Sequence, residues 1–279
     1  MKKTIMVVMM LLAAIIIIAG VFVDAKYIEP DRIIIAKNSY NLTGRFSNPI
    51  KIILISDIHI GSEKEGDLQK KIQMINDQNP DVVLIAGDFV NSQIDEVEEL
   101  RPLSALKAKY GKYAVLGNHD YGLWYSDPEK ANDILAQTVS NELNKDGITV
   151  LKNEFEEIRI DGKRFELYGL DEQWSGRSKY NESGLGIPKI ILAHEQLAVD
   201  EKQIAQKTLI LSGHTHCGEI RIPIITDYLI KRYSGFGNTV GGWNKRNEHI
   251  DEYVTCGLTR GTTGFRFLTN PEITIIDIY

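Results

Sequence analysis

Carboxylate, imidazole and amide side chains recur in this chain at short spacings. They form an Asp-x-His pair, a Gly-Asp pair, a Gly-Asn-His-Asp run, one isolated histidine and a His-x-His pair. These ligand types suit Mn²⁺, Fe²⁺ or Zn²⁺ better than Ca²⁺. Two such ions held side by side can ionise water and bind phosphoryl oxygens, which is the chemistry of phosphate ester hydrolysis. The candidates are Asp57, His59, Asp88, Asn118, His119, Asp120, His194, His214 and His216.

Each polar group directly follows a short apolar run. The runs occupy residues 51–56, 81–87, 112–117, 189–193 and 207–213 and are rich in Val, Ile and Leu. Near-continuous apolar runs of this length are typical of strands buried on both faces. Helical patterns separate them at residues 66–78, 95–109, 127–146 and 198–206. Because open α/β sheets place their sites at the carboxyl ends of strands, the polar side chains are expected to meet at one edge.

Taken singly, these motifs have ordinary structural explanations. A Gly-Asp pair often caps a helix, and an isolated histidine such as His194 is often a satisfied core residue. Six histidines occur in the chain, however, and five of them follow the apolar runs, so that His249 alone lies outside the pattern. Caps and turns do not explain that concentration, and a functional site does.

The remaining sequence predicts the second half of the fold. Residues 155–160 and 164–170, joined across Asp161-Gly162, read as a β-hairpin, and residues 252–258 and 272–279 supply further strands. Together with the parallel units this predicts an α/β fold of two packed mixed β-sheets flanked by helices. No linker-like segment divides the part after residue 50.

In this order, the motifs resemble the five signature blocks of the calcineurin-like metallophosphoesterase superfamily, whose fold is an α/β/β/α sandwich. The resemblance spans residues 51–279. Segments 56–62, 86–90, 117–121, 170–177 and 257–261 are similar to a bacterial branch of membrane-associated phosphodiesterases that includes UDP-2,3-diacylglucosamine pyrophosphatases.

The resemblance implies two divalent metal sites that share Asp88. The first would use Asp57, His59, Asp88 and His216, and the second Asp88, Asn118, His194 and His214. Mn²⁺ is the metal expected, with Fe²⁺ or Zn²⁺ as alternatives, and a hydroxide bridging the ions would attack phosphorus. His119 would stabilise the phosphoryl charge or protonate the leaving oxygen, with Asp120 fixing its tautomer. Arg260 is the expected substrate-binding residue.

The only two cysteines, Cys217 and Cys256, leave one question open. The absence of a CxxC spacing excludes zinc fingers and thioredoxin-like sites. Cys217 replaces the glycine that usually follows the last ligand in relatives, so it fills a small space or brings a thiol near the metals. The two residues either stay unpaired or form a disulfide in an oxidising compartment.

The N-terminus predicts a single-pass membrane anchor. Residues 4–23 carry no charge and follow Lys2 and Lys3, and about 20 apolar residues match the hydrocarbon thickness of a bilayer. A cleaved signal peptide is the alternative, although this stretch is longer than most such segments. We therefore expect an anchor over residues 1–25, a juxtamembrane stem over 26–50 and a catalytic domain over 51–279. The short basic tail favours an extracytoplasmic domain.

Net charge and composition narrow the substrate. The formal net charge is −6, whereas proteins that bind nucleic acids usually carry a basic surface, so a nucleic-acid substrate is disfavoured. The aromatic segment 224–243, with Lys231 and Arg232, predicts a loop that caps the site or contacts the bilayer. The sequence thus predicts a dinuclear metal-dependent hydrolase of a phosphodiester or pyrophosphate bond in a lipid or cell-envelope substrate. The alternatives are a soluble phosphodiesterase or nuclease, and a catalytically silent metal-binding scaffold.

Overall fold

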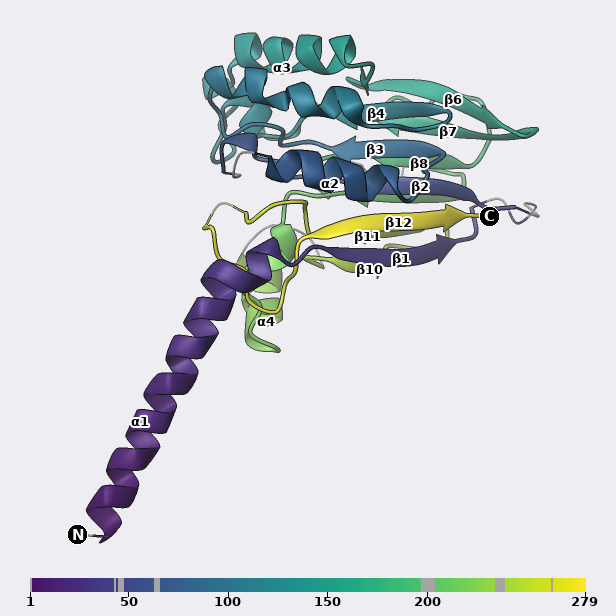
Figure 1. The fold of residues 1–279 in the computed structure, drawn as a ribbon. Coiled ribbons are helices and arrows are strands. Elements are labelled where there is room, and N and C mark those ends of the chain that lie inside the picture. Colours follow the sequence, from purple (N-terminus) through teal and green to yellow (C-terminus); the bar gives the residue numbers. More distant parts are fainter. Residues whose placement is uncertain are drawn as a thin grey trace.

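A long N-terminal helix leaves one corner of a body built from two β-sheets (Figure 1). The computed structural model describes residues 2–42, 44, 48–62, 66–196, 204–233, 239–261 and 263–279. The helices are α1 (Lys2–Val23), α2 (Asp67–Asn76), α3 (Asp133–Lys145) and α4 (Ile225–Tyr233). Helices α2 and α3 cover the outer face of one sheet, and α4 lies at the end of the body from which α1 departs.

The first sheet has six strands in the order β1-β12-β2-β3-β4-β5. Its neighbours are parallel except for β12 and β2, which are antiparallel. The strands are β1 (Ile34–Tyr40), β2 (Ile50–Ile55), β3 (Val82–Ala86), β4 (Gly111–Val115), β5 (Thr149–Val150) and β12 (Glu272–Ile278).

The second sheet also has six strands, in the order β10-β11-β9-β8-β7-β6, with antiparallel pairs at its two edges. They are β6 (Glu154–Ile160), β7 (Lys163–Gly169), β8 (Lys189–Leu192), β9 (Thr208–Ser212), β10 (Gly242–Lys245) and β11 (Ile250–Val254). Two mixed sheets flanked by helices were expected from the sequence, and that architecture is confirmed.

The apolar runs are continuous because both faces of each central strand are covered. From β3, Leu84 faces the second sheet and packs with Leu192 and Leu211, whereas Val83 and Ile85 pack beneath the helices. Side chains alternate between the two faces of a strand, so a strand buried on both sides needs apolar residues throughout.

Three expected segments differ from the structure or lie outside it. The helix expected over residues 95–109 is a 3₁₀ helix, Asp95–Ala105, that contains Pro102, whose missing N–H and ring disfavour an α-helix. The helix expected over residues 198–206 falls largely outside the described residues. The segment 224–243 is not one loop: it contains α4 and the first half of β10, and residues 234–238 are outside the described part.

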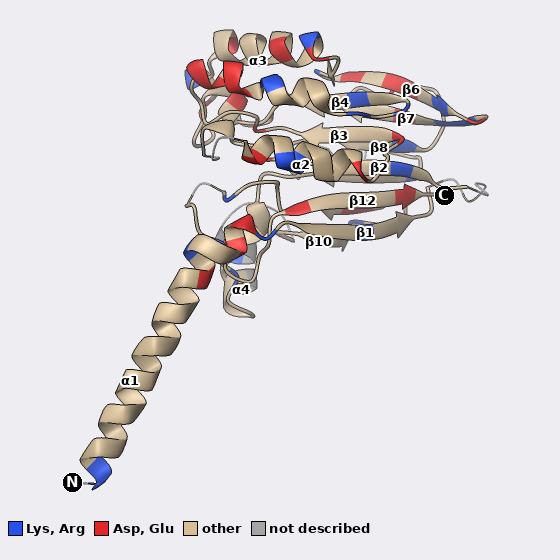
Figure 2. Ribbon diagram, in the orientation of Figure 1, with Lys and Arg blue, Asp and Glu red and all other residues tan. Residues whose placement is uncertain are grey.

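Helix α1 is the one described helix long and apolar enough to cross a membrane, with a mean hydropathy of 3.1 over its most apolar window. None of its residues is buried, and Figure 2 shows charged residues only at its two ends. The expected stem, residues 26–50, packs against the body of the protein. It carries β1, which pairs along its length with β12, and its Glu29 and Leu42 are buried.

Candidate metal centre

The carboxyl ends of β2, β3, β4, β8 and β9 bring the candidate ligands together at one edge of the two sheets. All of them are buried except His214, which is partly exposed. The close approach needs glycine at one strand end: a Cβ on Gly87, which has φ of +82°, would lie 2.6 Å from the Gly117 nitrogen and 2.7 Å from His194 Nδ1. The sequence prediction that these groups converge agrees with the geometry.

One cluster, here called the first group, consists of Asp57, His59 and His216. The Nε2 atoms of His59 and His216 lie 3.2 Å apart, and His216 Nε2 lies 3.4 Å from Asp57 Oδ1. Asp57 Oδ1 and His59 Nδ1 are buried without a hydrogen-bond partner among the described residues. Buried polar atoms are normally paired, so Asp57 Oδ1, which lies 3.4 Å from His216 Nε2, fits a metal ligand. The His59 atom that faces this group is Nε2, not Nδ1.

The second group consists of Asp88, Asn118, His194 and His214. His194 Nε2 lies 3.1 Å from each of three atoms, namely Asp88 Oδ2, Asn118 Oδ1 and His214 Nδ1. The two groups adjoin, because His59 Nε2 is 3.6 Å from Asp88 Oδ2. Asp88 therefore lies between the groups, the position that a bridging ligand needs, and the donor set fits two divalent ions.

Contacts behind the ligands fix their orientation. His194 Nδ1 lies 2.6 Å from the carbonyl of Ala86, and Asn118 Nδ2 donates to the carbonyl of Leu123 at 2.6 Å. Asp57 Oδ2 accepts from the Ser56 hydroxyl and from the His214 backbone N–H. A ring whose Nδ1 donates to a carbonyl presents Nε2 to a metal, which is the usual arrangement of a metal-binding histidine.

Burial leaves most of these rings neutral. It lowers the pKa of His59 to about 4 and that of His214 to about 3, and it holds the pKa of His216 well below its usual value. A neutral imidazole keeps the lone pair that a metal needs. Burial acts in the same direction on His194, but the carboxylates of Asp88, Glu195 and Asp57, with Asp88 foremost, together outweigh it and raise that pKa well above its usual value.

Several ligands have unusual backbone conformations. Five of the seven have positive φ, between +40° and +69°, namely Asp57, His59, Asp88, His214 and His216. Non-glycine residues in this region cost on the order of 1–3 kcal/mol each, and such strain concentrates at functional sites. Backbone hydrogen bonds hold two of them, since Asp57 N donates to Gly87 O and His59 N donates to Asp88 O.

His119 lies beside the two groups, with its ring centroid 4.9 Å from that of His59. The expectation that Asp120 fixes its tautomer is wrong. The Asp120 carboxylate accepts from the backbone N–H groups of residues 88, 89, 90 and 117, and so holds the loop after β3. His119 Nδ1 instead lies 3.1 Å from the hydroxyl of Ser92, a residue that no sequence motif indicated.

The ligands open onto a pocket of about 360 Å³ whose mouth is flanked by two tryptophans. Trp124 contacts His119 edge-on at 4.5 Å between centroids, and Trp174 contacts His214 in the same way at 4.7 Å. Arg260, expected to bind substrate, does not line this pocket, because its guanidinium pairs with Asp31. Glu219 also lines the pocket, which the sequence did not predict.

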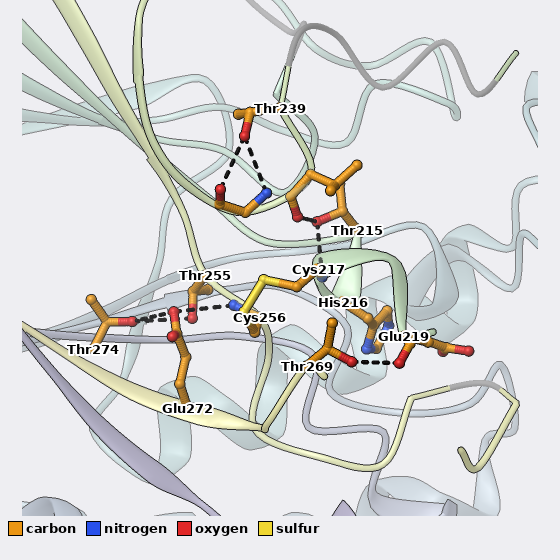
Figure 3. Close-up of a disulfide and its surroundings, with 12 residues drawn as sticks. Thr215, His216, Cys217, Glu219, Thr239, Thr255, Cys256, Thr269, Glu272 and Thr274 are labelled. Atoms are coloured by element: carbon orange, nitrogen blue, oxygen red, sulfur yellow. Dashed lines mark hydrogen bonds between the residues drawn. A yellow bond between two sulfur atoms is a disulfide. The ribbon is translucent and has the colours of Figure 1, made fainter. Parts of the chain in front are cut away.

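Cys217 and Cys256 form a disulfide beside His216 (Figure 3). It joins the loop after β9 to the segment after β11, two loops at the edge where the ligands meet. Of the two alternatives left open by the sequence, the structure has the paired one, so no free thiol faces the metal ligands.

Comparisons with known proteins agree with this geometry. A model of the calcineurin-like phosphoesterase family matches residues 50–218. The chain is 30% identical over 82% of its length to a Danio rerio transmembrane protein with metallophosphoesterase domain, but it spans only 53% of that relative. It is 28% identical to the uncharacterized metallophosphoesterase YkuE of Bacillus subtilis, over 91% of this chain and 88% of that protein.

Two further matches complete the comparison. The chain is 30% identical to the phosphodiesterase YaeI of Escherichia coli, over 82% of each protein. A dimetal phosphatase from Danio rerio is 12% identical, with a TM-score of 0.45, over 75% of this chain and 88% of that one.

Proposed function

The chain belongs to the calcineurin-like phosphoesterase family and is a metal-dependent phosphoesterase, and we propose that it hydrolyses a phosphodiester or pyrophosphate bond in a lipid-linked or cell-envelope substrate. The observation that supports hydrolysis is the pair of adjoining ligand groups that share Asp88. All seven ligands and His119 are present, so nothing in the site favours the silent scaffold.

In this proposal, two sets of residues that share Asp88 hold the two ions. Asp57, His59, Asp88 and His216 would hold one ion, and Asp88, Asn118, His194 and His214 the other. When bound, two divalent ions polarise phosphoryl oxygens and make water acidic enough to react near neutral pH. Mn²⁺ is the metal we propose, because carboxylate, amide and imidazole donors suit it.

His119 would bind the substrate phosphoryl group or protonate the leaving oxygen. Its Nδ1 is engaged by Ser92, and its ring borders both the His59 ring and the pocket mouth. Ser92 would set the tautomer, the task that the sequence assigned to Asp120. This leaves Nε2 of His119 as the atom available for a proton at the leaving group.

The apolar surface around α4 supports a lipid-linked substrate. Ile222, Ile224 and Ile225 are 45%, 84% and 54% exposed, and Tyr228 and Leu229 are 61% and 47% exposed. Contiguous exposed apolar side chains are uncommon on soluble proteins and mark membrane or protein contacts. This surface begins three residues after Glu219 at the pocket rim and lies at the end of the body where α1 departs (Figure 1).

The membrane is therefore the proposed partner of this surface. Arg232 lies on α4 with its side chain exposed, where it could meet anionic head groups; the side chain of Lys231 is outside the described residues. We place the domain on the extracytoplasmic side, and the disulfide supports this side because disulfides persist in oxidising compartments.

The hydrolase proposal is tested by metal removal and by His119→Ala. Chelation should abolish hydrolysis of a chromogenic diester, and added Mn²⁺ should restore it. His119→Ala should keep the metal content of the wild type while lowering kcat by about 10²–10⁴. Full activity of metal-stripped protein would exclude the proposed mechanism, and loss of metal in His119→Ala would make His119 a ligand.

The substrate proposal is tested on α4. The double variant Ile225→Gln and Tyr228→Gln should lose activity on a nucleotide-linked diacyl lipid pyrophosphate presented in anionic vesicles while keeping activity on a soluble diester. Ile134→Gln is the matched control, because Ile134 is 73% exposed on α3 and does not line the pocket. Equal loss on both substrates would make α4 a structural cap and favour a soluble natural substrate.

A further inference from the structure

A buried arginine, Arg266, joins the two loops next to the first group. Its side chain is fully buried. Nη1 donates to the carbonyl of His216 at 2.7 Å, while Nη2 donates to those of Cys256 and Thr259 at 2.9 and 2.6 Å and lies 3.4 Å from His216 Nδ1. One guanidinium thus links the loop after β9 to the segment after β11, the same two loops that the disulfide joins.

This arginine remains a cation despite its burial. Burial lowers its pKa to about 10, and four surrounding carboxylates oppose that shift: Glu219, Asp57, Glu272 and Glu29. A buried charge is costly unless hydrogen bonds and opposite charges surround it. The planar guanidinium offers five donors and so can bind several carbonyls from different segments at once, which a lysine ammonium cannot match.

The loop that Arg266 holds is strained. His216, Cys217 and Glu219 have φ of +50°, +53° and +53°. Left-handed conformations at consecutive non-glycine residues persist only where neighbouring structure enforces them. Arg266 binds the carbonyl of the first of these residues, and that residue is a ligand of the first group.

The segment that carries Arg266 is in turn held by the end of α1 and the residues after it. The Arg266 backbone N–H donates to the carbonyl of Ala25 at 2.9 Å, and Thr269 N donates to the buried carboxylate of Glu29 at 2.6 Å. The rings of Phe22 and Phe265 are in edge contact at 5.6 Å between centroids. Lys26 lies 4.2 Å from the centroid of the same Phe265 ring.

The same segment also contacts the loop of the first group directly. Phe267 N donates to the carbonyl of Glu219, and the Thr269 hydroxyl donates to that same carbonyl (Figure 3). Hydrogen bonds therefore connect three segments in series. The juxtamembrane residues bind segment 264–269, and that segment binds the loop of His216.

We propose that Arg266 is a positioning residue for the metal centre, and that juxtamembrane residues 22–29 hold it in place, so that the membrane anchor forms part of the support of the first group. The inference rests on the proposed two-metal function. It predicts that metal affinity at the first group depends on residues that approach neither ion.

The test is a titration of the full-length protein in detergent micelles with Mn²⁺. Calorimetry measures each binding event, and electron paramagnetic resonance detects the spin coupling of a dinuclear Mn²⁺ centre. Arg266→Met should weaken one of the two binding events by about 10–100-fold, the usual effect of removing a partner behind a ligand, and leave the other unchanged. Arg266→Lys, which restores the charge and part of the hydrogen bonding, should recover part of that affinity.

Two controls separate positioning from general stability. Lys189→Met removes another fully buried cation, one paired with Glu182 at 2.6 Å at the opposite end of β8 from His194. It should lower Tm without changing Mn²⁺ affinity. Asp57→Asn removes a proposed ligand and should weaken the same binding event as Arg266→Met.

The juxtamembrane part of the inference is tested at Glu29. Glu29→Leu removes the acceptor of the Thr269 N–H and should weaken the first binding event in the same direction as Arg266→Met, by a smaller factor. Asp31→Leu is the matched control, because it removes a more exposed carboxylate of the same segment that pairs with Arg260. It should leave Mn²⁺ affinity unchanged.

The outcomes are distinguishable. If the wild type binds two ions and Asp57→Asn weakens one, but Arg266→Met binds both as tightly as the wild type, the positioning role is wrong and the proposed function stands. Equal losses in Arg266→Met and Lys189→Met would likewise overturn it, since the effect would be general stability. If the wild type binds no pair of ions, the proposed function itself fails.

Discussion

The two ligand groups meet at Asp88 but are supported in different ways. The second group is supported by a strand end and by its own loop: His194 is fixed by the carbonyl of Ala86 at the end of β3, and Asn118 by that of Leu123, five residues later in the loop after β4. In the first group, His216 lies in a strained loop held from outside the sheets, by the disulfide and by Arg266. Nearby backbone carbonyls therefore support the second group, whereas the first group is also held by a disulfide and by a buried arginine.

The predictions that test this comparison begin with the residue that belongs to both groups. Asp88→Asn removes the one carboxylate between the two ions, so their mutual repulsion is no longer offset. We expect both Mn²⁺ binding events to weaken and diester hydrolysis to fall to background. Metal analysis that shows the loss of one ion alone would mean that Asp88 is not shared.

A pair of variants should separate the groups. Cys256→Ser opens the disulfide and should weaken Mn²⁺ binding at the first group alone, because Cys217 is next to His216. The loss should be small, because Arg266 continues to join the same two loops. Asn118→Ala should weaken the second group alone. The effect should be about 10–100-fold for the ligand, and smaller for the disulfide. Equal losses in the two variants, by calorimetric titration, would show that the groups are not supported independently.

The smallest expected effect is on pH dependence. In the metal-free protein Asp88 raises the pKa of His194 well above its usual value, so this ring is protonated at pH 7. Mn²⁺ must displace that proton, and its apparent affinity should rise by about tenfold per pH unit as pH increases from neutral towards that pKa. Titrations in buffers of different ionisation enthalpy measure the proton released. Release of none would contradict the assignment of His194 as a ligand.

The ligand groups could be anticipated from sequence because each ligand follows a strand whose apolar run is easily seen. The prediction was less successful where the function of a side chain depends on distant backbone. Asp120 is next to His119 in the sequence, yet its carboxylate binds the loop after β3, and Ser92 takes the expected place. Nothing in the residues around Arg266 indicates a guanidinium that binds His216, fifty positions earlier.

The contacts of the juxtamembrane stem are hidden in the sequence for a similar reason. Residues 26–50 lack a long apolar run and resemble a linker, but Glu29 binds Thr269 and β1 pairs with β12, both contacts with the far end of the chain. Pairing over such separations leaves no local pattern. Arg260 likewise lies in a glycine-rich segment near the metal ligands in sequence, but its partner Asp31 belongs to the juxtamembrane turn.

The position of β12 between β1 and β2 has a consequence for biogenesis. Ile34 pairs with Glu272, and β12 lies between two strands that precede it in the sequence by more than two hundred residues. Strand β1 precedes β12 along the chain, so β1 has an unpaired edge until β12 has been synthesised. Unpaired strand edges favour aggregation, and contacts so distant in sequence form slowly. Pairing of β1 with the sheet therefore waits for β12, and a chain interrupted shortly before residue 272 would lack the strand that joins β1 to β2.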